Sequence, residues 1–381
     1  MTAAPVVVAL AASDAVVEFL AAGGVEVVTL PRLERPVDDM AADLRRTHVD
    51  RIAGVVAVSD ETVAHAALLN AALGTLGTSP ASVALAGDKL AMRSRLAEAG
   101  ASTIRWAPVA SESDVRAVVD ELGPVIVKPS EGSASRHVFR VGAAADAVMD
   151  ALGPLLSRES GWIAEEFLDG PEISVESLSW AGRHDVLAIT AKETGPGFVE
   201  LGHRVPAALP NHLAAEVCTL VAQVLDTLGL DHVVSHTELI LTASGPRLVE
   251  THPRIGGDRI GRLVELVTGR HPLTSLAHAL SGRAPKRQAH DRGSGPGAAA
   301  IAFLVAPPGT ITAVRGADVA ARSRGVVETR LSAVVGDTVG PLTSSADRCG
   351  HVIAVARESG EAADLARAAA DVIRIETVPA G

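Results

Sequence analysis

The sequence is poor in aromatic side chains, cysteine and net positive charge. Tyrosine is absent and aromatic residues make up only 2% of the 381 residues, so the core must be built from small and β-branched side chains. The two cysteines, Cys218 and Cys349, are far apart and neither belongs to a CxxC pair, which disfavours a disulfide framework and a zinc site. The net charge of −11 disfavours a nucleic-acid-binding protein, because that class normally presents a basic face.

Long apolar runs and a basic leader are also missing. No run approaches the roughly 18 consecutive apolar residues that a membrane-spanning helix needs. The N-terminal stretch MTAAPVVVALAAS carries no basic residue, so we interpret it as a first strand and not as a signal peptide. These features predict a cytoplasmic protein with neither a membrane nor a nucleic-acid partner.

The first part of the chain alternates short apolar runs with a helical pattern. A chain of 381 residues is expected to form about two or three domains. Residues 5–10, 25–30 and 54–59 predict buried strands, and residues 13–22 predict a helix. This alternation is typical of a small parallel α/β domain. No GxGxxG motif follows the first strand, so a dinucleotide-binding role is weakly supported.

Two helix starts follow this region. Residues 60–62 (Asp-Glu-Thr) are interpreted as the cap and first turn of a helix and not as a site. Residues 88–102 predict another helix, with Asp88 as its cap and Lys89 in its first turn, where the helix dipole disfavours a cation. A solvated lysine is the simpler interpretation of this spacing, and a lysine that reaches out to an anion is the alternative.

Residues 123–141 predict a hairpin flap that could wrap a polyphosphate. An apolar strand ends in Lys128, a loop of small residues follows, and a second strand begins at Val138. Backbone N–H groups and hydroxyls of such a loop can bind phosphate, while the lysine supplies a point charge. The pattern GxxxxGK[ST] is absent, and a glycine–serine hairpin on its own is more often only a turn. The hydroxyls concerned are those of Ser130, Ser133 and Ser135.

Residues 161–178 predict an extended linker between two strands. The stretch AEEFLDGPE holds two acids, two apolar residues, a turn and then Glu172 at the start of another strand. The free backbone groups of such a linker can pair with the edge of a purine, and a following acid can bind ribose hydroxyls. A solvent-facing hairpin explains the stretch equally well when it is taken alone.

Residues 236–257 predict an antiparallel hairpin with a charged face. A short turn should bring Glu238 and Glu250 to the same end and face, where two carboxylates repel unless a cation lies between them. Hard oxygen ligands without thiols indicate Mg²⁺ or Mn²⁺. His252 and Arg254 should continue the same face because strand side chains alternate. An exposed charged face explains any one of these residues well but the whole set poorly.

Taken in order, five motifs resemble the ATP-grasp superfamily of carboxylate–amine ligases, and most closely the L-amino-acid ligases that make dipeptides and related ligases of peptide natural-product pathways. The motifs are DKLAMR, VIVKPSEGSASR, AEEFLDGPE, FVELGHRVPA and HTELILTASGPRLVETHPRIGGDRI. The resemblance covers essentially the whole chain and implies a mixed α/β and α+β architecture, the ATP-grasp fold. Its expected parts are an N-terminal Rossmann-like α/β domain (1–86), a two-lobed nucleotide clamp (87–290, flap lobe about 120–168) and a C-terminal α+β domain (291–381).

The resemblance also implies a nucleotide site. In that superfamily the first and second lysines, here Lys89 and Lys128, contact the phosphates of ATP, and the flap closes over them. The linker holds adenine, mainly through its backbone, and the later acid, here Glu172, binds the ribose. The linker residues are Glu165, Glu166, Phe167 and Leu168.

The metal and substrate positions are implied in the same way. The paired acids, here Glu238 and Glu250, carry the Mg²⁺ or Mn²⁺ ions, and His252 is a candidate third ligand. The arginine, here Arg254, stabilises the reacting carboxylate, its acyl phosphate and the tetrahedral intermediate. Further candidate catalytic and substrate-binding residues, in FVELGHRVPA, are Glu200 and His203.

The sequence departs from the superfamily pattern in two places. Ala134 and His137 occupy flap positions that usually carry glycine, which makes the mobility of the flap less certain. His252 stands where asparagine is common; a histidine that ligates a metal must be neutral, so activity should fall at low pH.

The glycine turn after this position offers further substrate contacts. Asp258 and Arg259 could hold the ammonium and carboxylate of an amino acid, with Gly256 and Gly257 before them. An ordinary helix N-terminus is the alternative interpretation.

The rest of the chain shows no catalytic cluster. Residues 284–295 are polar and read as a linker or surface loop, and the strands and helix that follow predict a packing or dimer-forming domain, hence a homodimer.

The predicted function is that of an ATP-dependent ligase. It would activate a small-molecule carboxylate as an acyl phosphate and join it to an amine, both from amino acids, with release of ADP and phosphate. One alternative is a bicarbonate-activating carboxylase of the biotin carboxylase or purine-pathway type. The other is a non-catalytic regulator that binds nucleotide.

Overall fold

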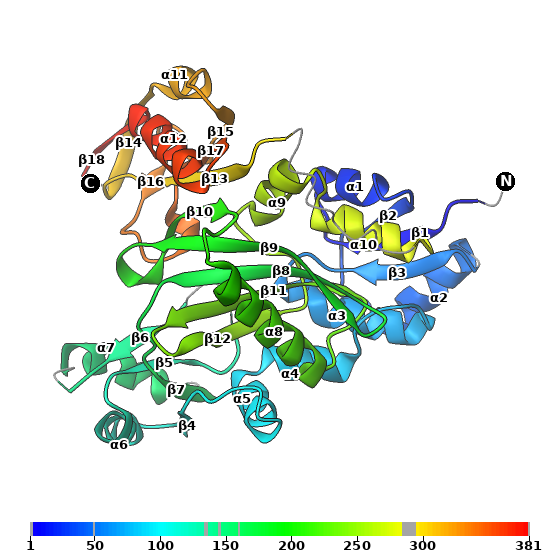
Figure 1. Ribbon diagram of the computed structural model, residues 1–381, viewed down its shortest axis with the longest axis horizontal. Coiled ribbons are helices and arrows are strands. Elements are labelled where there is room, and N and C mark those ends of the chain that lie inside the picture. Colours follow the sequence, from blue (N-terminus) through cyan, green and yellow to red (C-terminus); the bar gives the residue numbers. More distant parts are fainter. Residues whose placement is uncertain are drawn as a thin grey trace.

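The computed structural model of the protein describes residues 3–48, 50–132, 136–143, 146–158, 161–283 and 295–379. A long antiparallel sheet lies at the centre (Figure 1). Around it lie the N-terminal unit on one side, a smaller four-stranded sheet below and the C-terminal segment, defined here as residues 295–379, above. The predicted ATP-grasp architecture with mixed helix and strand content is confirmed.

The N-terminal unit is a small parallel sheet with helices around it. Its elements are β1 (Val6–Leu10), α1 (Asp14–Ala21), β2 (Glu26–Leu30), α2 (Val37–Thr47), β3 (Ile52–Val56), α3 (Asp60–Leu73) and α4 (Pro80–Gly87). The strand order is β2-β1-β3, and every residue of β1 is buried, as expected for a central parallel strand. The predicted alternation is confirmed, although β3 begins two residues before the predicted strand at 54–59.

The next unit is a four-stranded antiparallel sheet in the order β4-β7-β5-β6. It is preceded by a helix that the Asp88 side chain caps by accepting from two backbone N–H groups, as predicted. The predicted flap is present as the antiparallel pair β5–β6. The elements are α5 (Lys89–Glu98), β4 (Trp106–Val109), α6 (Glu112–Leu122), β5 (Val125–Pro129), β6 (Phe139–Val141), α7 (Asp146–Leu156) and β7 (Trp162–Glu166).

The central sheet has eight strands and joins the middle of the chain to its C-terminal segment. The first elements are β8 (Glu172–Trp180), β9 (Arg183–Thr194), η1 (Pro196–Phe198), β10 (Glu200–Val205), α8 (Asn211–Leu228), β11 (Val233–Thr242) and β12 (Gly245–His252). The later strands are β13 (Ala298–Leu304), β15 (Val326–Leu331) and β17 (Gly350–Ala356). The order is β12-β11-β8-β9-β10-β13-β17-β15, so β10 and β13 connect the two parts through backbone hydrogen bonds.

Small side chains close the core where aromatic ones are scarce. In the C-terminal segment, Ala298, Ala300 and Ala354 of the sheet pack against Ala362 and Ala366 of a helix, and all five side chains are fully buried. Alanine lets the helix lie close to the sheet without voids. The remaining elements are α9 (Ile260–Thr268), α10 (Pro272–Leu280), β14 (Gly309–Arg315), α11 (Ala317–Ala321), β16 (Thr338–Val339), η2 (Ser345–Asp347), α12 (Ser359–Val372) and β18 (Arg374–Val378).

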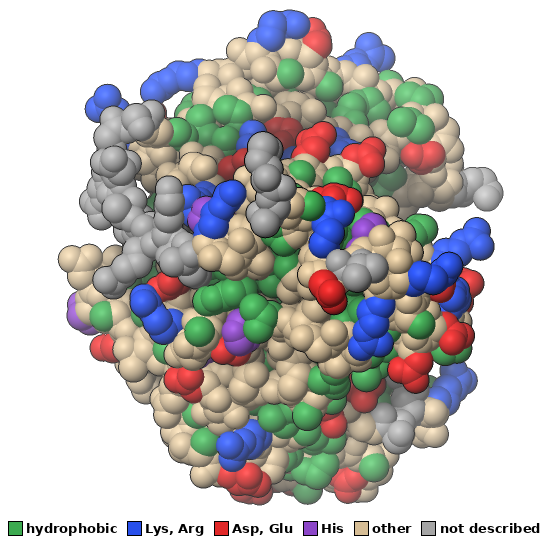
Figure 2. Space-filling model, turned by 90° about the vertical axis from the view of Figure 1, so that its right-hand side faces the viewer, with side chains coloured by type: hydrophobic (Ala, Val, Ile, Leu, Met, Phe, Trp, Pro, Cys, Tyr) green, Lys and Arg blue, Asp and Glu red, His purple; other side chains and the backbone are tan. Residues whose placement is uncertain are grey.

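The surface carries charges of both signs. On the face shown in Figure 2, basic and acidic side chains are interspersed over the N-terminal unit and its neighbours. In the described part of the chain, none of the helices has the length and apolar character needed to cross a membrane. Cys218 and Cys349 are both free thiols.

Candidate active site

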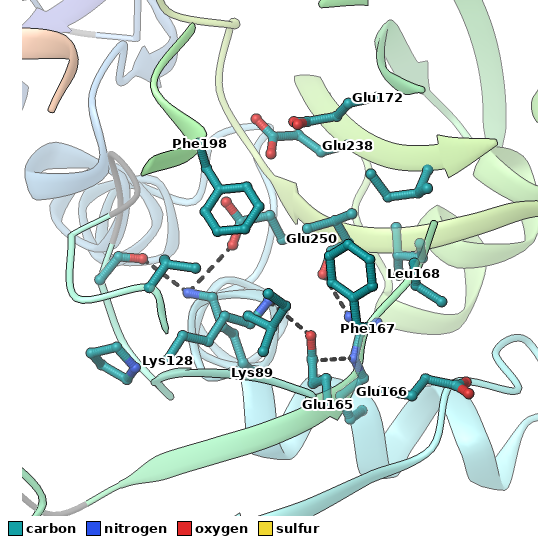
Figure 3. Close-up of a pocket in the computed structure, with 18 of the residues that line it drawn as sticks. Lys89, Lys128, Glu165, Glu166, Phe167, Leu168, Glu172, Phe198, Glu238 and Glu250 are labelled. Carbon is teal, nitrogen blue, oxygen red and sulfur yellow. Dashed lines mark hydrogen bonds and ion pairs between the residues drawn. The ribbon is translucent and has the colours of Figure 1, made fainter. Parts of the chain in front are cut away.

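A cavity of about 160 Å³ lies between the four-stranded sheet and the hairpin β11–β12. Figure 3 shows the two lysines on one side of it, Phe167 and Leu168 on the other, and acidic side chains above. Most of the residues predicted for nucleotide and metal therefore meet in one place. The lining includes Lys89, Lys128, Glu165, Glu166, Phe167, Leu168, Glu172, Phe198, Glu200, Glu238 and Glu250.

The two lysines are buried and aimed at this cavity. Lys89 is only 7% exposed; its Nζ donates to the carbonyl of Gly132 (3.0 Å) and lies 3.4 Å from Oε2 of Glu250. The simpler sequence interpretation, a solvated lysine, is therefore wrong. Lys128 is 6% exposed, and its Nζ lies 2.9 Å from Oε2 of Glu165. Two buried cations beside one cavity favour an anionic ligand there.

Glu165 holds the second lysine in place. Its buried carboxylate also accepts from Nε of Arg93 (2.6 Å). Burial alone would raise the pKa of Glu165, but the charges of Arg93 and Lys128 lower it to about 2. The Glu166 carboxylate is likewise paired, with Arg105 and Arg247. Both linker acids are thus engaged by basic side chains, and the backbone N–H groups of Glu166 and Phe167 donate to the carbonyls of Arg105 and Pro124, which leaves the apolar side chains of Phe167 and Leu168 to line the cavity.

The rest of the predicted flap is only partly described. Ser130 is buried; its backbone N–H donates to the carbonyl of Gly161 (2.6 Å) and its carbonyl accepts from the N–H of Lys89 (2.9 Å). Ser133 and Ser135 lie outside the described residues. Arg140 on β6 lies over the ring of Phe167, 3.9 Å from its centroid. The flap hairpin thus contacts the linker from above.

The predicted pairing of the two metal acids is confirmed. Glu238 on β11 and Glu250 on β12 are direct partners in the antiparallel register. Burial disfavours the charged form of Glu238, yet the charge of Lys192 and a hydrogen bond from His236 lower its pKa well below the usual range. For Glu250, the charges of His252 and Lys89 likewise overcome burial and lower the pKa. Both side chains are therefore carboxylates at neutral pH.

Lys192 on β9 was not predicted, and it joins three of the predicted acids. Its Nζ lies 2.9 Å from Oε1 of Glu238 and 3.4 Å from Oε1 of Glu200, and it also pairs with Glu172. Burial would lower the pKa of Lys192, but these acids raise it well above its ordinary value. Burial raises the pKa of Glu172, the residue predicted to bind ribose. A lone lysine in the apolar stretch VLAITAK was the available signal.

His252 is held between two carboxylates. Its Nε2 lies 3.0 Å from Oε1 of Glu250 and its Nδ1 lies 3.2 Å from Oδ1 of Asp60. Burial would lower the pKa of His252, but the Glu250 charge and hydrogen bonds to Asp60 and Glu250 raise it to about 9. The imidazole is thus a cation at neutral pH, with both nitrogens engaged. The role of His252 as a third metal ligand, and the loss of activity at low pH that goes with it, stay predictions.

Arg254 is bound by the N-terminal unit. Its Nε and Nη2 each donate to a different oxygen of Asp60, both at 2.6 Å, which makes a bidentate pair. These hydrogen bonds and that from His252 lower the pKa of Asp60 well below its usual range, although burial opposes the shift. The interpretation of Asp60 as part of a helix start is right for its backbone, but its side chain belongs to the site.

A second buried pair supports the hairpin from behind. Nδ1 of His236 lies 2.6 Å from Oε1 of Glu176, and its Nε2 lies 3.0 Å from Oε1 of Glu238. Burial would lower the pKa of His236, but these acids raise it to about 10. The Gly256 N–H donates to Oε2 of Glu176, and a Cβ at Gly256 would lie 2.8 Å from Nδ1 of His236. Glycine is therefore required there, while a Cβ at Gly257 would meet open space.

His203 and Asp258 lie together, and the C-terminal segment contacts both Asp258 and Glu200. Nε2 of the buried His203 lies 3.0 Å from Oδ2 of Asp258, which also accepts from Nη1 of Arg348 (2.8 Å). The Ser345 hydroxyl donates to Oε2 of Glu200 (2.8 Å). The segment predicted to serve packing or dimer formation thus also contacts two of the predicted substrate-binding residues. Neither Ser345 nor Arg348 carried a local motif that indicated a site.

The paired acids Glu238 and Glu250 are suited to a magnesium ion whose other ligands include phosphate oxygens. Among the residues the structure describes, no group of three or more His, Cys, Asp or Glu side chains is arranged to hold a metal ion. Mg²⁺ commonly uses only one or two protein carboxylates and completes its shell with phosphate oxygens and water. The ionised pair Glu238 and Glu250 beside two buried lysines meets that requirement.

Comparison with known proteins gives the same assignment for two parts of the chain. Residues 122–262 match the ATP-grasp domain family, and residues 302–378 match the family described as L-amino acid ligase C-terminal domain 2. A crystal structure of an L-amino acid ligase from Bacillus licheniformis superposes with a TM-score of 0.78 at 21% identity, covering 99% of this chain and 100% of that one.

Two curated relatives are 27% and 29% identical in sequence. Uncharacterized protein y4rH of Sinorhizobium fredii is 27% identical, over 96% of this chain and 76% of its own length. The alanine–anticapsin ligase of Bacillus subtilis is 29% identical, and the match covers 49% of this chain and 44% of that enzyme. The chain thus aligns with less than half of the ligase whose reaction its name states.

Proposed function

We propose that the chain joins two amino acids in an ATP-dependent reaction, because residues 122–262 match the ATP-grasp domain family and residues 302–378 match the L-amino acid ligase C-terminal domain 2. One observation carries this proposal. Glu238 and Glu250 face each other across one hairpin, and the buried Lys89 and Lys128 line the same cavity. This arrangement fits a polyphosphate with its cation. The predicted substrate residues Glu200, His203 and Asp258, here called the substrate wall, lie beside it.

The reaction proceeds in two transfers. A carboxylate oxygen of the first amino acid attacks the γ-phosphorus of ATP, the bond to the β,γ-bridging oxygen breaks, and ADP leaves. The amine of the second amino acid then attacks the acyl carbon, phosphate leaves with the C–O bond electrons, and the amine loses a proton. Lys89 and Lys128 hold the phosphates, and the Arg254 guanidinium holds the carboxylate and its acyl phosphate.

The cation belongs with the paired acids. Glu238 and Glu250 would hold Mg²⁺ or Mn²⁺, which supplies neutralisation of the phosphate charge when bound. Lys192 links Glu238 to Glu200, so it couples the metal acids to the substrate wall. Lys192 is buried among these acids, so it places a fixed positive charge beside the substrate wall.

Two observations support amino acids as substrates: the polar side chains of the substrate wall and the names of the relatives. Glu200, His203 and Asp258 offer both acidic and imidazole groups for an ammonium and a carboxylate. Relatives named alanine–anticapsin ligase join alanine to a second compound, as their name states. The domain limits of 1–86, 87–290 and 291–381 are proposed with this function, and the homodimer stays a prediction.

A matrix screen tests the proposal. The purified protein is incubated with ATP, Mg²⁺ and pairs of amino acids, while phosphate release and product masses are measured. We expect ADP and phosphate in equal amounts with a dipeptide, and a dependence on Mg²⁺ or Mn²⁺. Formation of AMP and pyrophosphate would contradict the ligase class. ADP release that depends on bicarbonate, or ATP binding without any turnover, would favour one of the two alternative functions.

A further inference from the structure

The turn that follows the hairpin β11–β12 contains an unusual backbone. Asp258 and Arg259 have φ angles of 53° and 64°. Among the described residues this is the one place where two consecutive non-glycine residues both have positive φ. Residues other than glycine are unfavourable in this conformation, so it persists only where neighbouring groups stabilise it. The contacts of these two residues should therefore show what holds the turn.

Asp258 is held by an arginine of the C-terminal segment. Arg348 pairs through both terminal nitrogens with the two carboxylate oxygens, the longer bond being 2.8 Å. Its Nε donates to the carbonyl of Ser345 (2.8 Å), and its guanidinium lies 3.7 Å from the ring centroid of Phe303. The Arg348 side chain is only 9% exposed. Hydrogen bonds and the contact with the ring thus fix the position of this guanidinium.

Arg259 is held by a glutamate of the same segment. Nη2 of Arg259 donates to both carboxylate oxygens of Glu328, each at 2.7 Å. Nε2 of His351 lies 2.9 Å from Oε1 of the same carboxylate. Asp258 and Arg259 therefore each have a partner in residues 328–351, a different part of the chain, and His203 of β10 is a further partner of Asp258.

The turn connects to the groups proposed for the reaction. It follows Arg254 on the same loop, and Arg348 also donates to the backbone carbonyl of Glu200 (3.3 Å). A displacement of about 1 Å at such groups can cost about a hundredfold in rate. A clamp on the turn would thus set the positions of Arg254 and the substrate wall together.

We propose that Arg348 and Glu328 are positioning residues: the C-terminal segment clamps the left-handed pair Asp258–Arg259 and thereby sets the geometry for attack by the amine. This inference rests on the proposed ligase function. Neither residue needs to touch a substrate, since each acts through the turn.

The first test compares Arg348→Met with Arg324→Met. Arg324 belongs to the same segment, but its exposed pair with Glu361 does not reach the turn. We expect amide formation by Arg348→Met to fall about a hundredfold, with a raised KM for the amine and unchanged affinity for ATP. Arg348→Lys should recover only part of the loss, because an ammonium lacks the planar fork. Arg324→Met should behave like the wild type.

The second test is a double-mutant cycle that separates strain from general stability. Glu328→Gln should reduce amide formation in the wild-type background. In the Arg259→Gly background, where the left-handed conformation is no longer strained, Glu328→Gln should cost little more. An equal cost in both backgrounds would overturn the clamp.

The third test does not depend on turnover. Hydrogen exchange is measured in the substrate-free protein at the amides of Ile260, Arg262 and Leu263, which bond to carbonyls of Gly257 and Arg259. Arg348→Met should exchange faster there than Arg324→Met. If the wild type makes no amide but the turn loosens, the proposed function fails and the clamp stands. Unchanged exchange and activity, or losses of ATP binding and melting temperature in step with activity, would overturn the clamp.

Discussion

The two sides of the site are built in different ways. On the nucleotide side, Lys128 and Glu165 lie on adjacent strands of one sheet, and the linker continues directly from β7. On the substrate side, Arg254 is paired with a residue 194 positions away, and Glu200 and Asp258 receive bonds from residues 145 and 90 positions away. The nucleotide side is therefore built from neighbouring strands of one lobe together with α5 and the hairpin β11–β12, whereas the substrate side exists only when all parts of the chain are assembled.

This difference teaches where each kind of damage should appear. A change on the nucleotide side disturbs buried charges within one lobe, so it should affect folding of that lobe. A change on the substrate side disturbs contacts between distant segments, so it should affect geometry and rate more than stability. Four substitutions test this contrast, beginning with the acid at which the two sides meet.

Glu250→Gln should have the largest effect. Glu250 contacts Lys89 of the nucleotide side and His252 of the substrate side, so its charge serves both. We expect phosphate release to fall about a thousandfold, because a preorganised charge for the metal and phosphate is lost. The rate is measured at saturating ATP and Mg²⁺. The exposed Glu361→Gln is the control, and an unchanged rate for Glu250→Gln would remove Glu250 from the metal site.

Glu165→Gln should lower stability on the nucleotide side. It leaves Arg93 and Lys128 buried without their counter-charge, which should cost about 3 kcal/mol of unfolding free energy at neutral pH. The folded pKa of Glu165 lies below its ordinary 4.5, at about 2. The stabilisation is therefore present above pH 4.5 and is lost as the pH falls towards 2.

Urea unfolding followed by circular dichroism measures this effect at a series of pH values. The gap between wild type and Glu165→Gln should narrow as the pH falls below 4.5. A gap that is constant with pH would mean that the carboxylate is not the source of the stabilisation.

Arg254→Lys tests the substrate side alone. An ammonium cannot hold both oxygens of one carboxylate with the geometry of a guanidinium, so amide formation should fall about a hundredfold. ATP affinity should persist, because Lys89 and Lys128 are unchanged. Nucleotide binding and product formation are measured side by side. If both survive, Arg254 has no part in the chemistry, and if both collapse with the melting temperature, its role is structural.

Asp60→Asn should have the smallest effect of the four, and it should lower the KM for the substrate carboxylate. The Asp60 carboxylate occupies the fork of Arg254, and an amide cannot accept both of its hydrogen bonds. Without this pairing the Arg254 guanidinium binds the substrate carboxylate more readily, so the KM for that substrate should fall about fivefold. Glu61→Gln, in the same exposed helix turn, is the control. A raised KM would instead mean that Asp60 itself binds the substrate.

The same contrast explains what could be predicted from the sequence. The pairing of Glu238 with Glu250 was predictable, because a short turn and the alternation of side chains determine the register of a hairpin. The ATP-grasp fold was predictable because its motifs are local and occur in a defined order. The burial of Lys89 was not, since it depends on Gly132 and Glu250, which are remote in the chain.

The partners of the predicted substrate residues escaped prediction for the same physical reason. Asp60 has the pattern of an ordinary helix start, and Arg348 that of a surface arginine before a strand. Their roles come from partners that only the tertiary fold supplies. The protonation of His252 was also inaccessible, because it depends on two carboxylates brought to its ring from separate elements.

The position of Trp162 in the flap lobe has a practical consequence for spectroscopy. The protein contains three tryptophans and no tyrosine, and Trp106 and Trp162 both lie in the four-stranded sheet. Trp162 is buried opposite Pro129, and its side chain packs in the apolar core with Val125 and Val127, whereas their strand neighbour Lys128 lines the cavity. Intrinsic emission excited in the near ultraviolet thus comes mainly from this lobe, without a tyrosine background. Unfolding of this lobe, which exposes the buried Trp162, can therefore be followed in the unlabelled protein.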